Sequence, residues 1–154
     1  MGGRNALTLT RSRVPPVAGE VAQFDHMSGG RFLFGIGSGG LASDFELFKI
    51  DPKNRHGAFI ESIETILRIW SQDPPYDIQG EFWNVQIKKA ILPELGVGFM
   101  PKPLQKPHPP LWSACGSDET AVQTGNLAMG GLFGSEGGPE GMDAYLNTKA
   151  IHQA

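Results

Sequence analysis

Hydrophobic and polar positions along this 154-residue chain follow a helical period most clearly between Arg55 and Gln72. Glu64 and Arg68 lie one turn apart on the polar side of that segment. The apolar side chains recur every three or four residues on the other side: Ile60, Ile63, Leu67 and Trp70. This pattern predicts an amphipathic helix over residues 55–72.

Short apolar segments without this period are typical of β-strands. We expect strands at residues 5–10, 31–36, 110–116 and, more weakly, 127–134. The remaining helices are expected at residues 15–28, which start with two prolines and end at Gly29–Gly30, at residues 117–125 and at residues 143–151. Strands that alternate with helices pair in a parallel sheet, so the pattern predicts an α/β fold.

The strand–helix alternation amounts to about four βα units. A (β/α)8 barrel typically takes ~250 residues, so four units correspond either to a small open α/β domain or to part of a barrel. We expect a single domain over residues 1–154, with an irregular insertion at about 73–109. The insertion shows no clear period, and a segment of that length inside a compact domain is usually functional or lid-like.

Composition narrows the possible classes of protein. The net charge of −3 argues against nucleic acid as the main partner, because phosphate binding needs an excess of Lys and Arg. A single cysteine, Cys115, excludes an intrachain disulfide and fits a reducing compartment. The sequence shows neither a signal peptide nor an apolar run of ~20 residues, so we expect a cytoplasmic protein. His56, His108 and His152 lack metal-ligand spacing, and no metal is expected.

A glycine loop follows the second expected strand and is open to several interpretations. Residues 35–40 (GIGSGG) satisfy the dinucleotide-binding pattern G-x-G-x-x-G. That interpretation also requires a helix that opens within the loop, whereas the amphipathic helix begins only at Arg55 and contains Glu61. A second interpretation is a plain turn that needs glycine for a positive φ. The third depends on the residues around the loop.

Residues 24–32 (FDHMSGGRF) closely resemble the "LDHLSGGR" signature of the bacterial luciferase-like flavin-dependent monooxygenases. The likeness spans most of residues 17–135 and continues through these positions: Gly35–Gly37, Phe45, Phe48, Arg55, Glu61, Trp70, residues 107–112 and residues 114–120. The resemblance implies a TIM-barrel (β/α)8 fold that binds reduced FMN or, in a sister branch, the deazaflavin F420. By this resemblance the chain looks like the third to sixth βα units, which is a partial barrel.

The resemblance also implies an activity. Such an enzyme inserts one oxygen atom from O2 into an apolar organic substrate, aldehyde or terpene-like, with reduced FMN supplied by a flavin reductase. The insertion would shape the substrate pocket through its aromatic and apolar residues: Tyr76, Phe82, Trp83, Phe99 and Met100. Within it, residues 80–83 (GEFW) resemble the "G-x-[FY]" hairpin of the family. The family's catalytic histidine, where there is one, comes from strands without a counterpart here, so no catalytic residue is assigned.

Other functions therefore stay open. The chain is alternatively a truncated, non-catalytic flavin-binding module, an F420-dependent oxidoreductase, or a fragment that must self-associate. Exposed sheet edges favour a homo-oligomer.

Barrel enzymes place their chemistry at the carboxyl ends of the strands, and this rule sorts the candidate residues. Gly37, Ser38 and Gly39 follow the 31–36 strand, and together with Gly40 they would let flavin approach the backbone closely. The resemblance implies an arginine near the position of Ser38 that contacts the FMN phosphate. Serine at this position would weaken that contact, and Arg55 or Lys49 would either replace the charge or remain solvated.

Gly116, Ser117 and Thr120 follow the 110–116 strand and open a helix, where backbone N–H groups and hydroxyls bind phosphate readily. The resemblance implies that Ser117 and Thr120 hold the FMN phosphate, while the simpler alternative is an N-cap formed by Ser117. Cys115 at the same strand end would touch the flavin ring, or it is an inert packing residue.

The signature itself precedes its strand and therefore belongs to the opposite, structural face. There we expect a helix stop, a turn, and a hydrogen-bonded latch that involves either Asp25 with Arg31 or His26.

Overall fold

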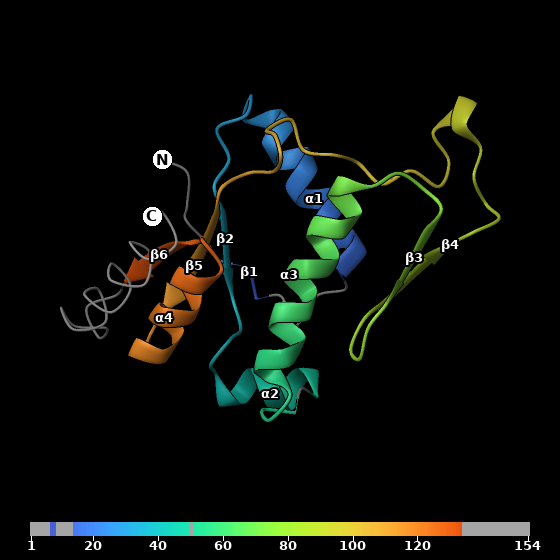
Figure 1. The fold of residues 1–154 in the computed structure, drawn as a ribbon. Coiled ribbons are helices and arrows are strands. Elements are labelled where there is room, and N and C mark those ends of the chain that lie inside the picture. Colours follow the sequence, from blue (N-terminus) through green and yellow to red (C-terminus); the bar gives the residue numbers. More distant parts are fainter. Residues whose placement is uncertain (1–6, 9–13, 50, 134–154) are drawn as a thin grey trace. The chain divides into compact units, whose positions relative to one another are not determined.

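The computed structural model describes residues 7–8, 14–49 and 51–133 (Figure 1). These residues belong to two compact units. Of the described residues, the first unit includes 7, 33–37 and 110–133, and the second includes 8, 14–32, 38–49 and 51–109. Each unit is described below by itself, and the single domain expected from the sequence stays a prediction.

A parallel sheet organises the first unit. It has the order β1-β2-β5-β6, from β1 (Leu7–Thr8), β2 (Phe34–Gly37), β5 (Leu111–Cys115) and β6 (Gly130–Phe133). β2 pairs in parallel with β5, and β5 pairs in parallel with β6. The α/β fold with a parallel sheet is therefore confirmed. The helix expected at residues 143–151, and residues 5–6 and 9–10 of the first expected strand, lie outside the described residues.

Helix α4 (Asp118–Asn126) contacts both β5 and β6. The side chains of Cys115 and Ala121 are buried between them, and Phe133 packs against this pair. Gly130 of β6 pairs with Trp112 of β5, and a Cβ at position 130 would lie 2.5 Å from the indole ring. Only glycine fits there, because a side chain would displace the tryptophan.

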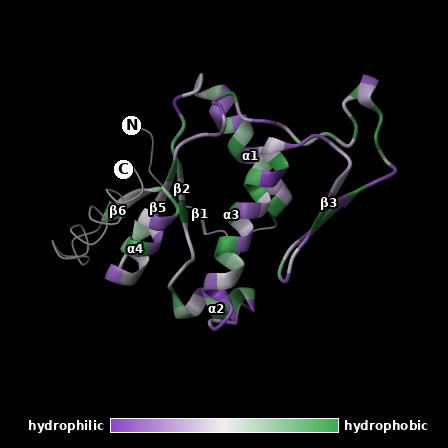
Figure 2. Ribbon diagram, viewed as in Figure 1, coloured by the Kyte–Doolittle hydropathy of each residue, from purple (hydrophilic) through white to green (hydrophobic). Residues whose placement is uncertain are grey.

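Two packed helices form the centre of the second unit. α1 (Val14–Met27) packs against α3 (Arg55–Ser71), and the Trp70 indole N–H of α3 donates to the Ala18 carbonyl of α1. Both helices are amphipathic, with apolar and polar residues interspersed along each ribbon (Figure 2). The helix expected at 55–72 is confirmed, but its buried stripe is centred on Phe59, Ile63, Ile66, Ile69 and Trp70. Ile60 and Leu67 are only half-buried.

Two elements of the second unit were not expected: the short helix α2 (Ala42–Phe48), which has no buried residue, and the single turn η2 (Pro93–Leu95). The insertion also contains a hairpin of β3 (Tyr76–Gln79) and β4 (Asn84–Ile87), paired antiparallel. Its turn lies at residues 80–83, where the resemblance implies a hairpin, although the strands themselves were not predicted. The hairpin strands do alternate buried and exposed residues, but four residues each are too few to stand out in a sequence.

Candidate functional site

The carboxyl ends of β2 and β5 define one edge of the sheet. Ile36 of β2 pairs with Ser113 of β5, so Gly37, the last residue of β2, and Gly116, the residue after β5, lie at this edge. A Cβ on either glycine would meet no heavy atom within 4 Å. The edge therefore leaves room for a ligand beside the backbone at both positions.

Ser117 connects β5 to α4 as the N-cap of the helix. Its Oγ accepts a hydrogen bond from the Thr120 backbone N–H at 3.3 Å, and it lies 3.0 Å from the Thr120 Oγ1. The N-cap expected from the sequence is thus confirmed. Two hydroxyls at the positive end of a helix dipole also make a donor set that suits a phosphate group. Asp118 is exposed next to them, and its charge opposes an anion.

Cys115 lies one residue before this turn, with its side chain on the α4 side of the sheet. The thiol is buried and lies 3.4 Å from the Thr124 Oγ1, to which it donates, and 3.5 Å from the Ser113 carbonyl. These contacts account for Cys115 as a packing residue. Its contact with a flavin ring stays a prediction.

In the second unit, the glycine loop is tied to the start of α3. Gly39 has a φ of 76°, so the turn does require glycine at this position. The Arg55 Nη1 donates to the Gly39 carbonyl at 3.1 Å, and its guanidinium lies 5.9 Å from the centre of the Phe45 ring. The Ser38 Oγ lies within the same loop, 3.5 Å from the Gly39 carbonyl. Sequence analysis suggested Arg55 only as a charge near the loop and missed this bond.

The latch of the signature differs in part from expectation. The Asp25 carboxylate does not bind Arg31, which is exposed; it accepts hydrogen bonds from the Gln105 backbone N–H and side-chain amide, both at 2.7 Å. Arg31 was the nearest cation in sequence, but a buried carboxylate is satisfied better by donors that are themselves part-buried. His26 does form a hydrogen bond, but its partner lies outside the signature: its Nε2 is 3.0 Å from the Lys102 carbonyl.

Burial by itself would raise the pKa of Asp25. Hydrogen bonds from Gln105 and from the Leu104 backbone, with the nearby His26, outweigh burial and hold that pKa below its usual value.

The residues expected to shape the substrate pocket differ in exposure, and that role stays a prediction. Tyr76 is fully buried, and its hydroxyl accepts from the Met100 backbone N–H. Phe99 is exposed, in a loop whose other exposed apolar residues are Leu92, Leu95 and Val97. Only Phe82 and Trp83 are half-buried aromatic rings of the hairpin turn.

Among the described residues, no cluster of His, Cys, Asp and Glu could hold a metal ion. Within the same ranges, no helix is both long and apolar enough to cross a membrane.

The chain belongs to the luciferase-like monooxygenase family, whose model matches residues 6–149. It is 35% identical over 114 residues to the oxygenase component of the flavin-dependent trigonelline monooxygenase of Acinetobacter baylyi, which covers 71% of this chain and 29% of that protein. It is 25% identical over 133 residues to the FMNH2-dependent dimethylsulfone monooxygenase of Pseudomonas putida, and the match covers 84% of this chain and 34% of that protein.

Solved structures agree on the fold. The monooxygenase RslO1 of Streptomyces bottropensis matches 97% of this chain and 44% of its own, with a TM-score of 0.79 and 20% identity. A second match is the oxygenating constituent of 3,6-diketocamphane monooxygenase of Pseudomonas putida, solved with FMN. It covers 95% of this chain and 42% of its own, with a TM-score of 0.80 and 17% identity. The chain spans between 16% and 34% of the length of the curated relatives it matches.

Proposed function

We propose that this protein binds FMN and belongs to a two-component monooxygenase that inserts one oxygen atom from O2 into an apolar organic substrate, aldehyde or terpene-like. The observation that carries the proposal is the family match over residues 6–149, with relatives named as flavin-dependent monooxygenases. The partner is a flavin reductase that supplies reduced FMN, since one relative is named as an oxygenase component. We also propose that the parallel sheet is part of a (β/α)8 barrel.

The residues at the strand edge fit the cofactor. Ser117 and Thr120 would bind the FMN phosphate with their hydroxyls and with the first N–H groups of α4. Gly37 and Gly116 would let the flavin approach the backbone, because no atom fills the space of a Cβ there. When bound, reduced flavin supplies the electrons that activate O2, and the protein's part is to anchor and orient it.

The glycine loop of the second unit is proposed as a flavin contact on its own grounds. Ser38 and Gly39 follow β2 directly, and Arg55 fixes the loop through the Gly39 carbonyl. Arg55 would add positive charge at the loop. Cys115 is retained as a candidate ring contact.

Equilibrium binding and turnover test the proposal together. The purified chain is titrated with FMN and with F420, and is then assayed with FMN, NADH, a flavin reductase and a long-chain aldehyde. We expect FMN binding and an oxygenated product. F420 binding in place of FMN would point to the deazaflavin branch, binding without product would indicate a non-catalytic module, and no flavin binding would overturn the proposal. Size-exclusion chromatography of the same sample tests the expected homo-oligomer.

A further inference from the structure

The turn of the β3–β4 hairpin holds the carboxylate of Glu61, a residue of α3. The Glu61 Oε1 accepts from the backbone N–H groups of Phe82 and Trp83 at 2.9 and 2.7 Å, and its Oε2 accepts from that of Glu81 at 2.9 Å. Consecutive N–H groups that converge in this way form an anion-binding nest. One side chain thus satisfies three donors of the turn.

Two further contacts fix the same turn on α3. The Trp83 indole N–H donates to the Ala58 carbonyl at 3.3 Å. A Cβ at Gly57 would lie 3.1 Å from the Phe82 ring, so the ring packs directly on the helix backbone. The turn is therefore attached at three neighbouring positions in the first two turns of α3.

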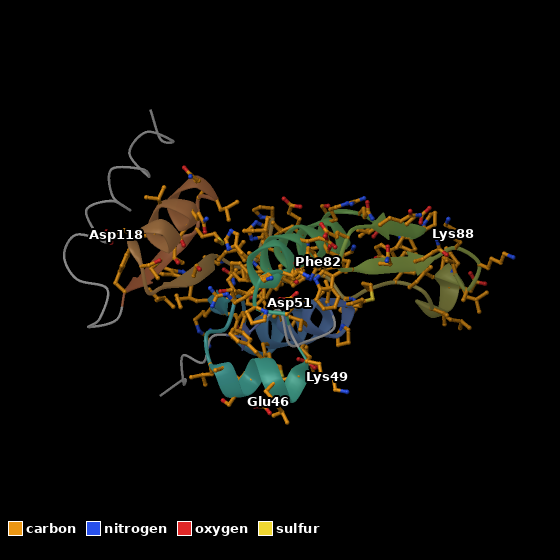
Figure 3. All side chains as sticks on the ribbon, turned by 90° about the horizontal axis from the view of Figure 1, so that it is seen from below. Glu46, Lys49, Asp51, Phe82, Lys88 and Asp118 are labelled. Atoms are coloured by element: carbon orange, nitrogen blue, oxygen red, sulfur yellow. The ribbon has the colours of Figure 1, made fainter. Side chains whose placement is uncertain are left out.

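The attachment places the turn at a particular end of the second unit. α3 begins at Arg55, whose guanidinium binds the Gly39 carbonyl of the glycine loop. A hairpin that follows a helix starts at the far end of that helix, yet this hairpin runs back along α3 toward α2 (Figure 1). Figure 3 labels Phe82 at α3, on whose backbone its ring packs at Gly57. The turn and the glycine loop are thus both held by the amino-terminal part of α3.

We infer that Glu61 is a positioning residue that holds the Phe82 ring as a contact surface for the apolar substrate. The inference rests on the proposed function, because that function supplies an apolar substrate and makes the glycine loop a ligand-binding segment. Tyr76, Ile78 and Val85 of the hairpin are buried in the core, whereas Phe82 and Trp83 of its turn are half-buried. Phe82 is selected because the Trp83 indole N–H already donates to the Ala58 carbonyl, whereas the Phe82 ring has no polar group to satisfy.

Photoaffinity labelling tests the contact without requiring turnover. The chain, with FMN, is irradiated with a dodecanal analogue that carries a diazirine, and labelled peptides are mapped by mass spectrometry. We expect labelling within residues 80–83 in the wild type and a loss of about fivefold or more in Glu61→Gln, because a displaced ring no longer meets the probe. Glu64→Gln, an exposed carboxylate on the same helix, is the matched control and should label like the wild type.

Amide hydrogen exchange on the same variants shows whether Glu61 acts through the turn. Gln retains one oxygen acceptor, so exchange at Glu81, Phe82 or Trp83 should rise about tenfold to a hundredfold in Glu61→Gln. The rest of the hairpin should exchange as in the wild type. Labelling elsewhere, absence of labelling, or equal labelling of wild type and Glu61→Gln would overturn the inference. Loss of FMN binding by the wild type would instead count against the proposed function.

Discussion

The carboxylate of Asp25 accepts two hydrogen bonds at 2.7 Å from Gln105, a residue that lies 80 positions further along the chain. The Gln105 amide also donates to the Phe32 carbonyl at 2.9 Å. A single glutamine therefore joins the end of α1, the turn after it and the segment that precedes β5. The Asp-containing signature of the family has a structural role in this chain.

Removing either partner should destabilise the fold. In Gln105→Ala and in Asp25→Asn, the free energy of unfolding should fall by about 2 kcal/mol, the usual cost of losing a part-buried hydrogen bond to a charged group. Urea unfolding measures this, with Gln23→Ala on the exposed side of α1 as the control. Equal stabilities of Gln105→Ala and Gln23→Ala would contradict the assignment of the latch.

The same carboxylate should make stability depend on pH. Its pKa is lowered from 3.8 in the folded protein, so the unfolded chain takes up the proton first as the pH falls. The stabilisation is complete above pH 3.8 and is lost as the pH falls below that value through the lower folded pKa. Unfolding free energies at about pH 6 and about pH 3 should differ more in the wild type than in Asp25→Asn. Parallel pH profiles of the two proteins would show that Asp25 does not carry this dependence.

Two glycines should respond in opposite ways to alanine. A Cβ at Gly80 would lie on the Glu61 carboxylate, so Gly80→Ala should displace the hairpin turn and cost about 2 kcal/mol. Gly19 lies within α1 and a Cβ there meets nothing within 4 Å, so Gly19→Ala should stabilise the protein by about 0.5–1 kcal/mol. Thermal unfolding of both variants checks the sign. A stabilising Gly80→Ala would show that the turn tolerates displacement of Glu61.

The sequence predicts the long elements well and the short ones poorly. Residues 55–72 have a sustained helical period, and residues 110–116 combine apolar composition with an N-cap signal at Ser117; both elements are present. α2 was not predicted because it buries no side chain, so its sequence shows no apolar stripe. The hairpin turn at residues 80–83 was expected only from the family resemblance, because the turn is held partly by Glu61, through contacts between residues 20 to 22 positions apart.

The candidate site residues likewise fall into those that the sequence locates and those that it does not. Strand ends can be located from the sequence, which places Gly37, Gly116 and Ser117 at the sheet edge, as the structure does. A hydrogen bond between two residues that are far apart along the chain leaves little signal in a single sequence. Asp25 has an arginine six positions away and binds Gln105 instead, and Arg55 binds a backbone carbonyl that no side-chain pattern marks.

FMN and riboflavin titrations of the wild type and Ser117→Asp test the central claim, that the turn after β5 holds a flavin phosphate. Aspartate preserves the N-cap of α4 but puts a negative charge where the phosphate would bind. The account predicts that the wild type binds FMN more tightly than riboflavin, and that Ser117→Asp weakens FMN binding about tenfold while riboflavin binding stays within about twofold. Equal wild-type affinities for the two flavins, or unchanged FMN binding by Ser117→Asp, would contradict it.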